Sequence, residues 1–268
     1  MRTVAHISDL HFGRVNCAIL PALTAAINAV RPDVVAVSGD LTQRARSGEF
    51  AAARDFLDTL PEPQIVVPGN HDVPLYDVFR RWWSPLKRYR RYISDDLEPF
   101  FADDEIAILG VNTARSFTFK NGRINGTQVA ASCSRLAKGG ENSVRILVTH
   151  HPFGVEEGSG GDIVGRADMA MTEFAKCRID VILTGHLHVS GIGSSASYYA
   201  LPGYSALFIH AGTATSVRQR GEVNAWNLIR IDGEVVSVDC FVWDATFGKF
   251  TVIKTSHFRR SPQGWSEI

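Results

Sequence analysis

Short apolar runs alternate with longer amphipathic segments over the first two thirds of the chain. Within 18–30, for example, Leu20, Leu23 and Ile27 recur at the spacing of one helix face. The same pattern predicts strands at 3–7, 34–37, 65–67, 106–111, 145–149 and 181–184 and helices at 18–30, 47–60, 127–137 and 167–177. Strand–helix–strand units of about 30 residues are typical of a parallel sheet with helical crossovers.

The helical period ends near Ser197, and the pattern of the remaining chain is that of strands. Apolar and β-branched residues predict strands at 206–211, 223–231, 235–243 and 250–254. Asp232-Gly233 predicts a tight hairpin turn between two of them. The sequence has no internal repeat and no linker-like segment. We therefore predict a single domain over 1–268, with a helical insert at about 74–105.

The charge balance is neutral, with 28 Lys and Arg residues against 28 Asp and Glu residues. Neutrality argues against a surface that is basic everywhere, and we expect no stable nucleic-acid partner. No run of about 18 apolar residues is present, so we expect no transmembrane segment. Asp9 interrupts the N-terminus before a signal-peptide apolar region develops, which predicts a cytoplasmic protein. The four scattered cysteines are then expected as reduced thiols, at Cys17, Cys133, Cys177 and Cys240.

Five of the predicted strands are followed by residues of metal-ligating type. These stretches are Asp9-Leu10-His11, Ser38-Gly39-Asp40, Gly69-Asn70-His71-Asp72, His150-His151-Pro152 and Gly185-His186-Leu187-His188. In an open α/β sheet the carboxyl ends of parallel strands lie at one edge, where binding sites form. Alternate residues of an extended chain project to one side, so Asp9 and His11 can reach the same ion. The sequence therefore predicts one site built from several strand ends.

The donor types restrict the metal. The set has no cysteine, and mixed carboxylate, imidazole and amide donors suit Mn, Fe or Zn. The donors outnumber the ligands of one tetrahedral ion, whereas two ions about 3.5–4 Å apart that share a carboxylate would use them all. Such a pair lowers the pKa of a bridging water and clamps a phosphoryl group. We therefore expect a metal-bridging hydroxide to attack phosphorus in line.

The order D-x-H, G-D, G-N-H-D, H-x-P, G-H-x-H resembles that of the calcineurin-like metallophosphoesterases. The motifs extend from Asp9 to His188, and none is missing. Within the family, the 38–43 and 69–72 segments are similar to those of bacterial class III cyclic-nucleotide phosphodiesterases and glycerophosphodiesterases. The resemblance implies an α/β fold, a four-layer αββα sandwich of two mixed β-sheets flanked by helices.

The resemblance also implies a role for each motif residue. One ion would be held by Asp9, His11, Asp40 and His188, and the second by Asp40, Asn70, His150 and His186. His71 would hydrogen-bond the phosphate and protonate the leaving oxygen. Asp72 is a candidate for orienting His71. The H-x-P spacing favours His150 over His151 as the ligand.

The implied function is metal-dependent hydrolysis of a small phosphodiester, with a cyclic nucleotide as the first candidate. A broad phosphatase for monoesters and a lipid or nucleotide pyrophosphatase remain alternatives. Pyrophosphatases of the lipid A pathway typically have Arg where this chain has His71, which argues against that alternative. A nuclease and a non-catalytic scaffold are less favoured, because the motifs are complete and little chain remains for nucleic-acid binding. A homodimer also remains open.

Residues 80–91 contain six Arg and Lys residues interleaved with aromatic ones. We favour an ordinary helical surface, in which an apolar stripe is buried and the charges face solvent, with a break near Pro85. The stripe would consist of Phe79, Trp82, Leu86, Tyr89 and Ile93. A cap over the site, a dimer contact and a lipid interface remain open. Two further segments are candidates near the site, the glycine-rich 156–165 loop and the pair Arg218 and Arg220.

Overall fold

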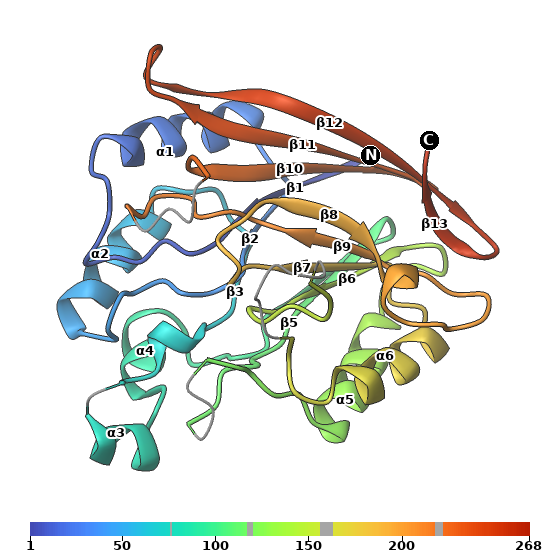
Figure 1. The fold of residues 1–268 in the computed structure, drawn as a ribbon, viewed down its shortest axis with the longest axis horizontal. Coiled ribbons are helices and arrows are strands. Elements are labelled where there is room, and N and C mark those ends of the chain that lie inside the picture. Colours follow the sequence, from blue (N-terminus) through green and yellow to red (C-terminus); the bar gives the residue numbers. More distant parts are fainter. Residues whose placement is uncertain (76, 117–119, 156–162, 218–221) are drawn as a thin grey trace.

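Two β-sheets pack face to face between two layers of helices (Figure 1). The computed structural model describes residues 1–75, 77–116, 120–155, 163–217 and 222–268. The helices are α1 (Ile19–Val30), α2 (Ser47–Leu57), α3 (Val78–Trp83), α4 (Lys87–Tyr92), α5 (Gly126–Leu136) and α6 (Ala167–Lys176), with 3₁₀ turns at Asn70–Asp72 and Ser195–Ser197.

The first sheet joins the N-terminal strands to the C-terminal ones. Its order is β13 (Gly264–Glu267), β12 (Lys249–Ser261), β11 (Val235–Asp244), β10 (Ala225–Asp232), β1 (Arg2–Ile7), β2 (Val34–Val37) and β3 (Gln64–Val66). β1, β2 and β3 run parallel, whereas β10 pairs antiparallel with β1, with Val4 opposite Ile229. The sheet is therefore mixed.

The second sheet is mixed as well. Its order is β4 (Phe100–Ala102), β5 (Ile106–Gly110), β6 (Val144–Val148), β7 (Val181–Thr184), β9 (Leu207–His210) and β8 (Gly191–Ser194). β5, β6, β7 and β9 are parallel, and the edge strands β4 and β8 are antiparallel to their neighbours. The strand–helix alternation along the chain predicts the parallel arrangement of β5, β6 and β7, whereas β9 lies in the part of the chain without a helical period.

The alternation of side chains along each strand produces three buried layers. Val4 lies in the core between the two sheets, while Ala5 and Ile7 pack toward α1 and α2. In the second sheet Ile146 faces the first sheet and Leu147 packs on the side of α5 and α6. The four-layer αββα sandwich predicted from the sequence is confirmed.

Several elements differ from the prediction at their ends. β12 extends well beyond the predicted 250–254, and the short strands β4, β8 and β13 were not predicted. α2 begins at Ser47, and the Glu49 carboxylate in its first turn accepts from the backbone N–H groups of Arg46 and Arg44. Within the described residues, no helix is both long and apolar enough to cross a bilayer.

The expectation of four reduced thiols is wrong for two of them. Cys133 on α5 and Cys177 at the end of α6 form a disulfide across 44 residues of chain, with their Cα atoms 5.6 Å apart. The two helices pack side by side on the second sheet, so their ends bring the two cysteines together. Cys17 and Cys240 are free.

The apolar stripe predicted over 79–93 is also wrong. The chain breaks between α3 and α4 at Ser84–Leu86, so the stripe does not lie on one helix. Leu86 and Tyr89 are buried, but Phe79 and Trp82 are 80% and 55% exposed. The break near Pro85 is confirmed.

Candidate metal centre

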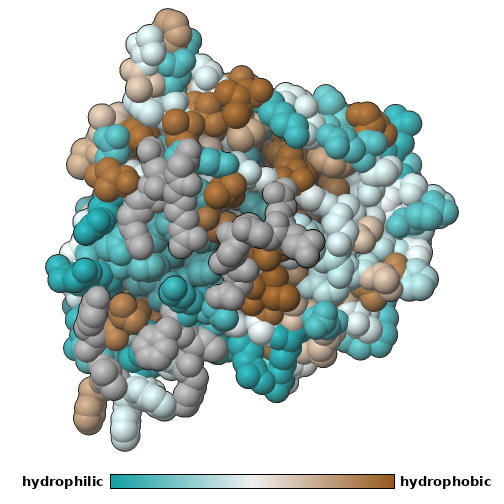
Figure 2. All heavy atoms as spheres, viewed as in Figure 1, coloured by the Kyte–Doolittle hydropathy of each residue, from teal (hydrophilic) through white to brown (hydrophobic). Residues whose placement is uncertain are grey.

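Both sheets direct the carboxyl ends of their parallel strands to one edge of the molecule. The turns after β1, β2 and β3 provide Asp9, His11, Asp40 and Asn70, and those after β6 and β7 provide His150, His186 and His188. Figure 2 shows a largely hydrophilic area left of the centre of this face, with apolar side chains above it, below it and toward the middle of the view. The structure brings together all seven residues predicted as metal ligands.

A first group of donors surrounds the carboxylate of Asp9. Its Oδ1 lies 3.4 Å from His188 Nε2 and 3.5 Å from His11 Nε2, and the two imidazole Nε2 atoms are 3.4 Å apart. Asp40 Oδ2 is 3.8 Å from His11 Nε2. The donor atoms of these four buried residues all lie within 4.8 Å of one another.

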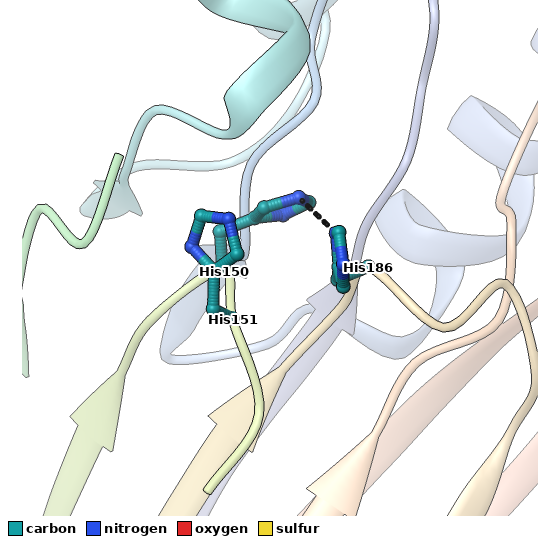
Figure 3. A group of neighbouring side chains, drawn as sticks. All are labelled: His150, His151 and His186. Carbon is teal, nitrogen blue, oxygen red and sulfur yellow. Dashed lines mark hydrogen bonds between the residues drawn. The ribbon is translucent and has the colours of Figure 1, made fainter. Parts of the chain in front are cut away.

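A second group lies around the amide of Asn70. Its Oδ1 is 3.1 Å from His150 Nε2 and 3.0 Å from His186 Nδ1, and these two nitrogens are 3.3 Å apart (Figure 3). Asp40 Oδ1 is 3.4 Å from His150 Nε2. Asp40 thus directs one carboxylate oxygen to each group, as expected of a bridging ligand.

Five of these seven residues have left-handed backbone conformations. The φ angles are 53° at Asp9, 49° at His11, 52° at Asp40, 72° at His186 and 62° at His188. Positive φ is uncommon for residues other than glycine, and such conformations occur frequently at functional sites. They turn each side chain away from the strand direction and toward the common edge.

Two glycines allow the strand ends to approach closely. A Cβ at position 69 would lie 2.1 Å from Asp40 Oδ1, and one at position 185 would lie 1.8 Å from Ser8 Oγ. Either contact is far inside van der Waals distance. Glycine at these two positions therefore allows the backbone to pack closely against Asp40 and against the Ser8–Asp9 segment.

The electrostatics favour cations at this edge. Burial alone would raise the pKa of Asp9, but His188 and His11 outweigh burial and lower it. His150 and His71 likewise lower the pKa of buried Asp40. Among the described residues no Lys or Arg contacts either carboxylate.

The imidazoles of the second group differ from each other. Burial opposes the charge on His150, but Asp40 outweighs it and raises its pKa to about 9. Burial and the neighbouring His150 lower the pKa of His186 to about 4.

Within the described residues, a buried oxygen atom of the donor set lacks a hydrogen-bond partner, as expected of a metal ligand. Asp9 Oδ1 is buried and has no hydrogen bond of ordinary geometry in the described part of the chain. A buried acceptor in this position carries a desolvation cost unless a cation or donor binds it. The residues present therefore fit bound metal cations, with carboxylate, imidazole and amide groups as donors.

His71 lies beside the first group and is half-buried. Its ring packs edge-on against His11 with centroids 5.0 Å apart, and its Nδ1 donates to the backbone carbonyl of Gln43 at 2.9 Å. In the neutral ring that hydrogen bond places the proton on Nδ1 and the lone pair on Nε2. Gln43 was not singled out in the sequence, because a carbonyl contact leaves no residue-type signal.

Asp72 contacts the backbone of the two loops rather than the His71 ring. Its carboxylate accepts from the N–H groups of Leu41, Thr42 and Gly69, and from the Thr42 hydroxyl. Burial and the nearby Asp40 raise its pKa to about 6. The His71 ring is held instead by the carbonyl of Gln43.

His151 lies beside the second group, and one of its ring nitrogens is within 4.8 Å of donor nitrogens of His150 and His186. Its Nδ1 is 2.7 Å from Thr113 Oγ1, and its ring centroid is 4.8 Å from that of His150 (Figure 3). Burial lowers the pKa of His151 well below its usual value.

Several hydroxyl and carbonyl groups that hold the site were also missed from the sequence. Ser8 Oγ donates to Asp9, Ser38 O accepts from His150 Nδ1, and Thr213 Oγ1 lies 2.9 Å from His188 Nδ1. Serines and threonines are too common for these three to stand out.

Two other predicted features are placed as follows. His6 is buried and His210 is partly buried, with Ser38 and Thr184 as their hydroxyl partners. Arg218, Arg220 and most of the 156–165 loop lie outside the described residues.

A model of the calcineurin-like phosphoesterase family matches residues 2–190. This is well over half of the chain, and the chain belongs to that family. It is a hydrolase of the metallophosphoesterase type, whose members depend on metal.

Three curated relatives are phosphodiesterases at modest identity. A probable cyclic nucleotide phosphodiesterase of Synechococcus sp. is 26% identical over 69% of this chain and 73% of its own length. The 3′,5′-cyclic adenosine monophosphate phosphodiesterase CpdA of Escherichia coli is 24% identical over 69% of each chain. Glycerophosphodiester phosphodiesterase GpdQ of Enterobacter lignolyticus is 29% identical over 56% of this chain and 57% of its own length.

Solved structures show the same fold at lower identity. Purple acid phosphatase PPD1 of yellow lupin superposes with a TM-score of 0.69 at 12% identity, over 96% of this chain and 53% of the phosphatase. Vps29 of Chaetomium thermophilum gives a TM-score of 0.51 at 13% identity, over 96% of this chain and 97% of its own.

Proposed function

We propose that the chain hydrolyses a small phosphodiester at a two-metal site, with a cyclic nucleotide as the favoured substrate. The observation that carries this proposal is the position of Asp40. One of its carboxylate oxygens faces His11 and the other faces His150, so that a single residue serves both donor groups. The proposed ligands are Asp9, His11, Asp40 and His188 for one ion, and Asp40, Asn70, His150 and His186 for the other.

Metal ions bound there would supply water activation and the positive charge that a phosphoryl group needs. The protein supplies the geometry. The Ser38 carbonyl holds the Nδ1 proton of His150, which presents Nε2 to the site. The Thr213 hydroxyl lies at hydrogen-bond distance from His188 Nδ1 and orients that ring. The Ser8 hydroxyl donates to the carboxylate of Asp9 and orients it.

His71 is the proposed general acid. The Gln43 carbonyl holds its Nδ1 proton, so the general acid is the imidazolium form, which passes the proton on Nε2 to the leaving oxygen and is left as the neutral ring with its proton on Nδ1. Asp72 is proposed as a positioning residue for this reaction, because it holds together the loops that carry Asp40 and His71.

The substrate class rests on the relatives. Two of the three are named as cyclic nucleotide phosphodiesterases, and each aligns with 69% of this chain. A glycerophosphodiester is the second candidate, because the relative of that name has the higher identity over a shorter stretch. Monoesters and nucleotide–lipid pyrophosphates are the remaining candidates.

The decisive experiment compares these substrates after reconstitution with Mn, Fe or Zn. We expect hydrolysis of 3′,5′- or 2′,3′-cyclic nucleotides above that of glycerophosphodiesters, monoesters and single-stranded DNA. Turnover of monoesters alone would rule out the diesterase. Metal analysis should return two ions per chain, and the Asp40→Asn variant should lose both.

The role of His71 has its own test. His71→Ala should retain its metal content and lose about 10²–10⁴-fold in the turnover of bis(p-nitrophenyl) phosphate. His257→Ala is the matched control, because His257 is exposed on β12. Unchanged turnover in His71→Ala would remove that residue from the mechanism. The cytoplasmic location and the homodimer stay predictions, the latter testable by light scattering.

A further inference from the structure

The corner formed by Leu75 and residues 77–92, here called the α3–α4 corner, exposes large aromatic side chains. Phe79 is 80% exposed and Trp83 is 82% exposed, and their rings stack with centroids 5.8 Å apart. Trp82 and Leu75 add 55% and 42% exposed side chains. A group of large apolar side chains exposed next to one another is typical of an interaction site.

The inner side of this corner is anchored, so the aromatic groups are held outward. Arg81 is buried and donates to the carbonyls of Ser116 and Pro74. Tyr89 is buried in α4, and its hydroxyl donates to the Val66 carbonyl at 2.9 Å. In Figure 1 α3 lies at the lower left extremity of the molecule, outside both sheets.

A basic pocket lies next to the aromatic side chains. Its volume is about 250 Å³, and its lining residues are Ser47, Arg80, Lys87, Arg88, Arg91 and Tyr92. Among the described residues that line it, four are cationic and none is a carboxylate. Arg80, which also pairs with Asp77 at 3.3 Å, follows Phe79 directly and connects the pocket to the aromatic stack.

These features are complementary to the surface of an anionic bilayer. Aromatic side chains favour the interfacial region, and clustered Lys and Arg residues are attracted to anionic headgroups. The whole chain is neutral, so this concentration of cations is a local feature.

A nucleic acid fits this corner less well than a bilayer does. Phe79 and Trp83 stack on each other, which leaves each ring at most one face for a base. Leu75 contributes apolar area but no stacking face.

We propose that the α3–α4 corner docks on an anionic phospholipid surface. Phe79 and Trp83 enter the interfacial region, and the basic pocket receives a lipid phosphate. This corner is distinct from the metal ligands, although it follows the Asn70–Asp72 turn directly in the chain. The docking would hold the hydrolase at a membrane.

The test is sedimentation of the intact chain with vesicles of phosphatidylcholine, with and without phosphatidylglycerol. We expect binding only to the anionic vesicles. Phe79→Ser should weaken it about tenfold, and Lys87→Ala and Arg91→Ala about fivefold each. Higher salt should weaken binding of the wild type to the vesicles. At high salt Lys87→Ala and Arg91→Ala should then bind nearly as well as the wild type does.

The matched control is Phe247→Ser with Lys249→Ala, because Phe247 is 70% exposed and Lys249 lies over its ring at 5.6 Å. This pair should leave vesicle binding unchanged. All the variants should retain hydrolysis of bis(p-nitrophenyl) phosphate, which reports that they are folded.

Brominated phosphatidylglycerol gives an independent readout of depth. Its tails should quench tryptophan fluorescence in the wild type, and less in Trp83→Phe. The proposal would be refuted if the wild type did not bind anionic vesicles. It would also be refuted if the control variant lost as much vesicle binding as the variants of the α3–α4 corner. Binding of single-stranded DNA in preference to vesicles, or a dimer that Phe79→Ser dissociates, would refute it as well.

Discussion

Asp72 binds Thr42 through two hydrogen bonds, because its Oδ1 accepts from both the backbone N–H and the hydroxyl at 2.9 Å. The other oxygen accepts from the N–H groups of Leu41 and Gly69. The carboxylate thereby joins the turn after β2, which carries Asp40, to the turn after β3, which carries His71. This buried side chain fixes the relative placement of these two residues together with the hydrogen bond from the His71 backbone N–H to Asp40 Oδ1.

We expect Asp72→Asn to lower the free energy of unfolding by about 1–3 kcal/mol, because an amide NH₂ would face backbone donors. Metal content per chain should fall as well, since Asp40 loses its fixed position. Chemical denaturation and metal analysis measure the two effects. Asp58→Asn removes an exposed ion pair with Arg54 and should change the stability by less than about 0.5 kcal/mol. Equal losses of stability in Asp72→Asn and Asp58→Asn would contradict the role of Asp72 in joining the two turns.

Gly185 offers a test of close packing at the site. An alanine Cβ there would lie 1.8 Å from Ser8 Oγ and 2.6 Å from Asp9 Oδ2, so the strand ends would have to separate. We expect Gly185→Ala to cost about 1–3 kcal/mol of stability and to weaken metal binding. Gly48→Ala is the control, because nothing lies within 4 Å of its Cβ in the first turn of α2. If Gly185→Ala bound metal as the wild type does, the packing argument would fail.

The strand ends were predictable because their signal is local. Apolar runs followed directly by Asp9-x-His11 or His186-x-His188 identify both the strand and the donors, and parallel strands share an edge. The left-handed conformations of these residues leave no such signal. They occur where distant segments meet, as when the backbone N–H of His186 donates to the carboxylate of Asp9.

The errors in the prediction have the same origin. The period of Phe79 and Trp82 matches a buried stripe, but burial requires a partner surface, and the break at Pro85 turns α3 away from the core. The Cys133–Cys177 pair depends on how α5 and α6 pack, which the 44-residue spacing does not encode. Gln43 acts on His71 through a backbone carbonyl that any residue could provide.

Removal of metal should destabilise the protein. Asp9 and Asp40 are both buried among imidazoles, and in the described structure no Lys or Arg contacts either carboxylate. Metal at about 100 times its dissociation constant would add about 2.7 kcal/mol by mass action. We expect a chelator to lower the melting temperature, and Mn or Zn to restore it. The Asp9→Asn variant should respond much less, and a wild type that is indifferent to chelation would argue against bound ions.

The partly buried histidine His210 predicts how the stability of the metal-free protein depends on pH. Burial lowers its pKa to about 4, while the unfolded chain has an ordinary value of about 6.5. Below pH 6.5 the unfolded state therefore binds more protons than the folded state. The contribution of His210 is complete above pH 6.5 and is lost as the pH falls toward 4, by about 1.4 kcal/mol per pH unit.

His210→Gln isolates this contribution. The glutamine removes one titrating group and retains an atom that can hydrogen-bond Thr184, which in the wild type lies 2.6 Å from His210 Nδ1. We expect the slope of the unfolding free energy between pH 6 and about 4.5 to decrease by nearly one proton, measured by urea titrations with a chelator present. His257→Gln, on the exposed side of β12, should leave the slope unchanged. An identical slope in His210→Gln and the wild type would show that His210 does not carry the acid sensitivity.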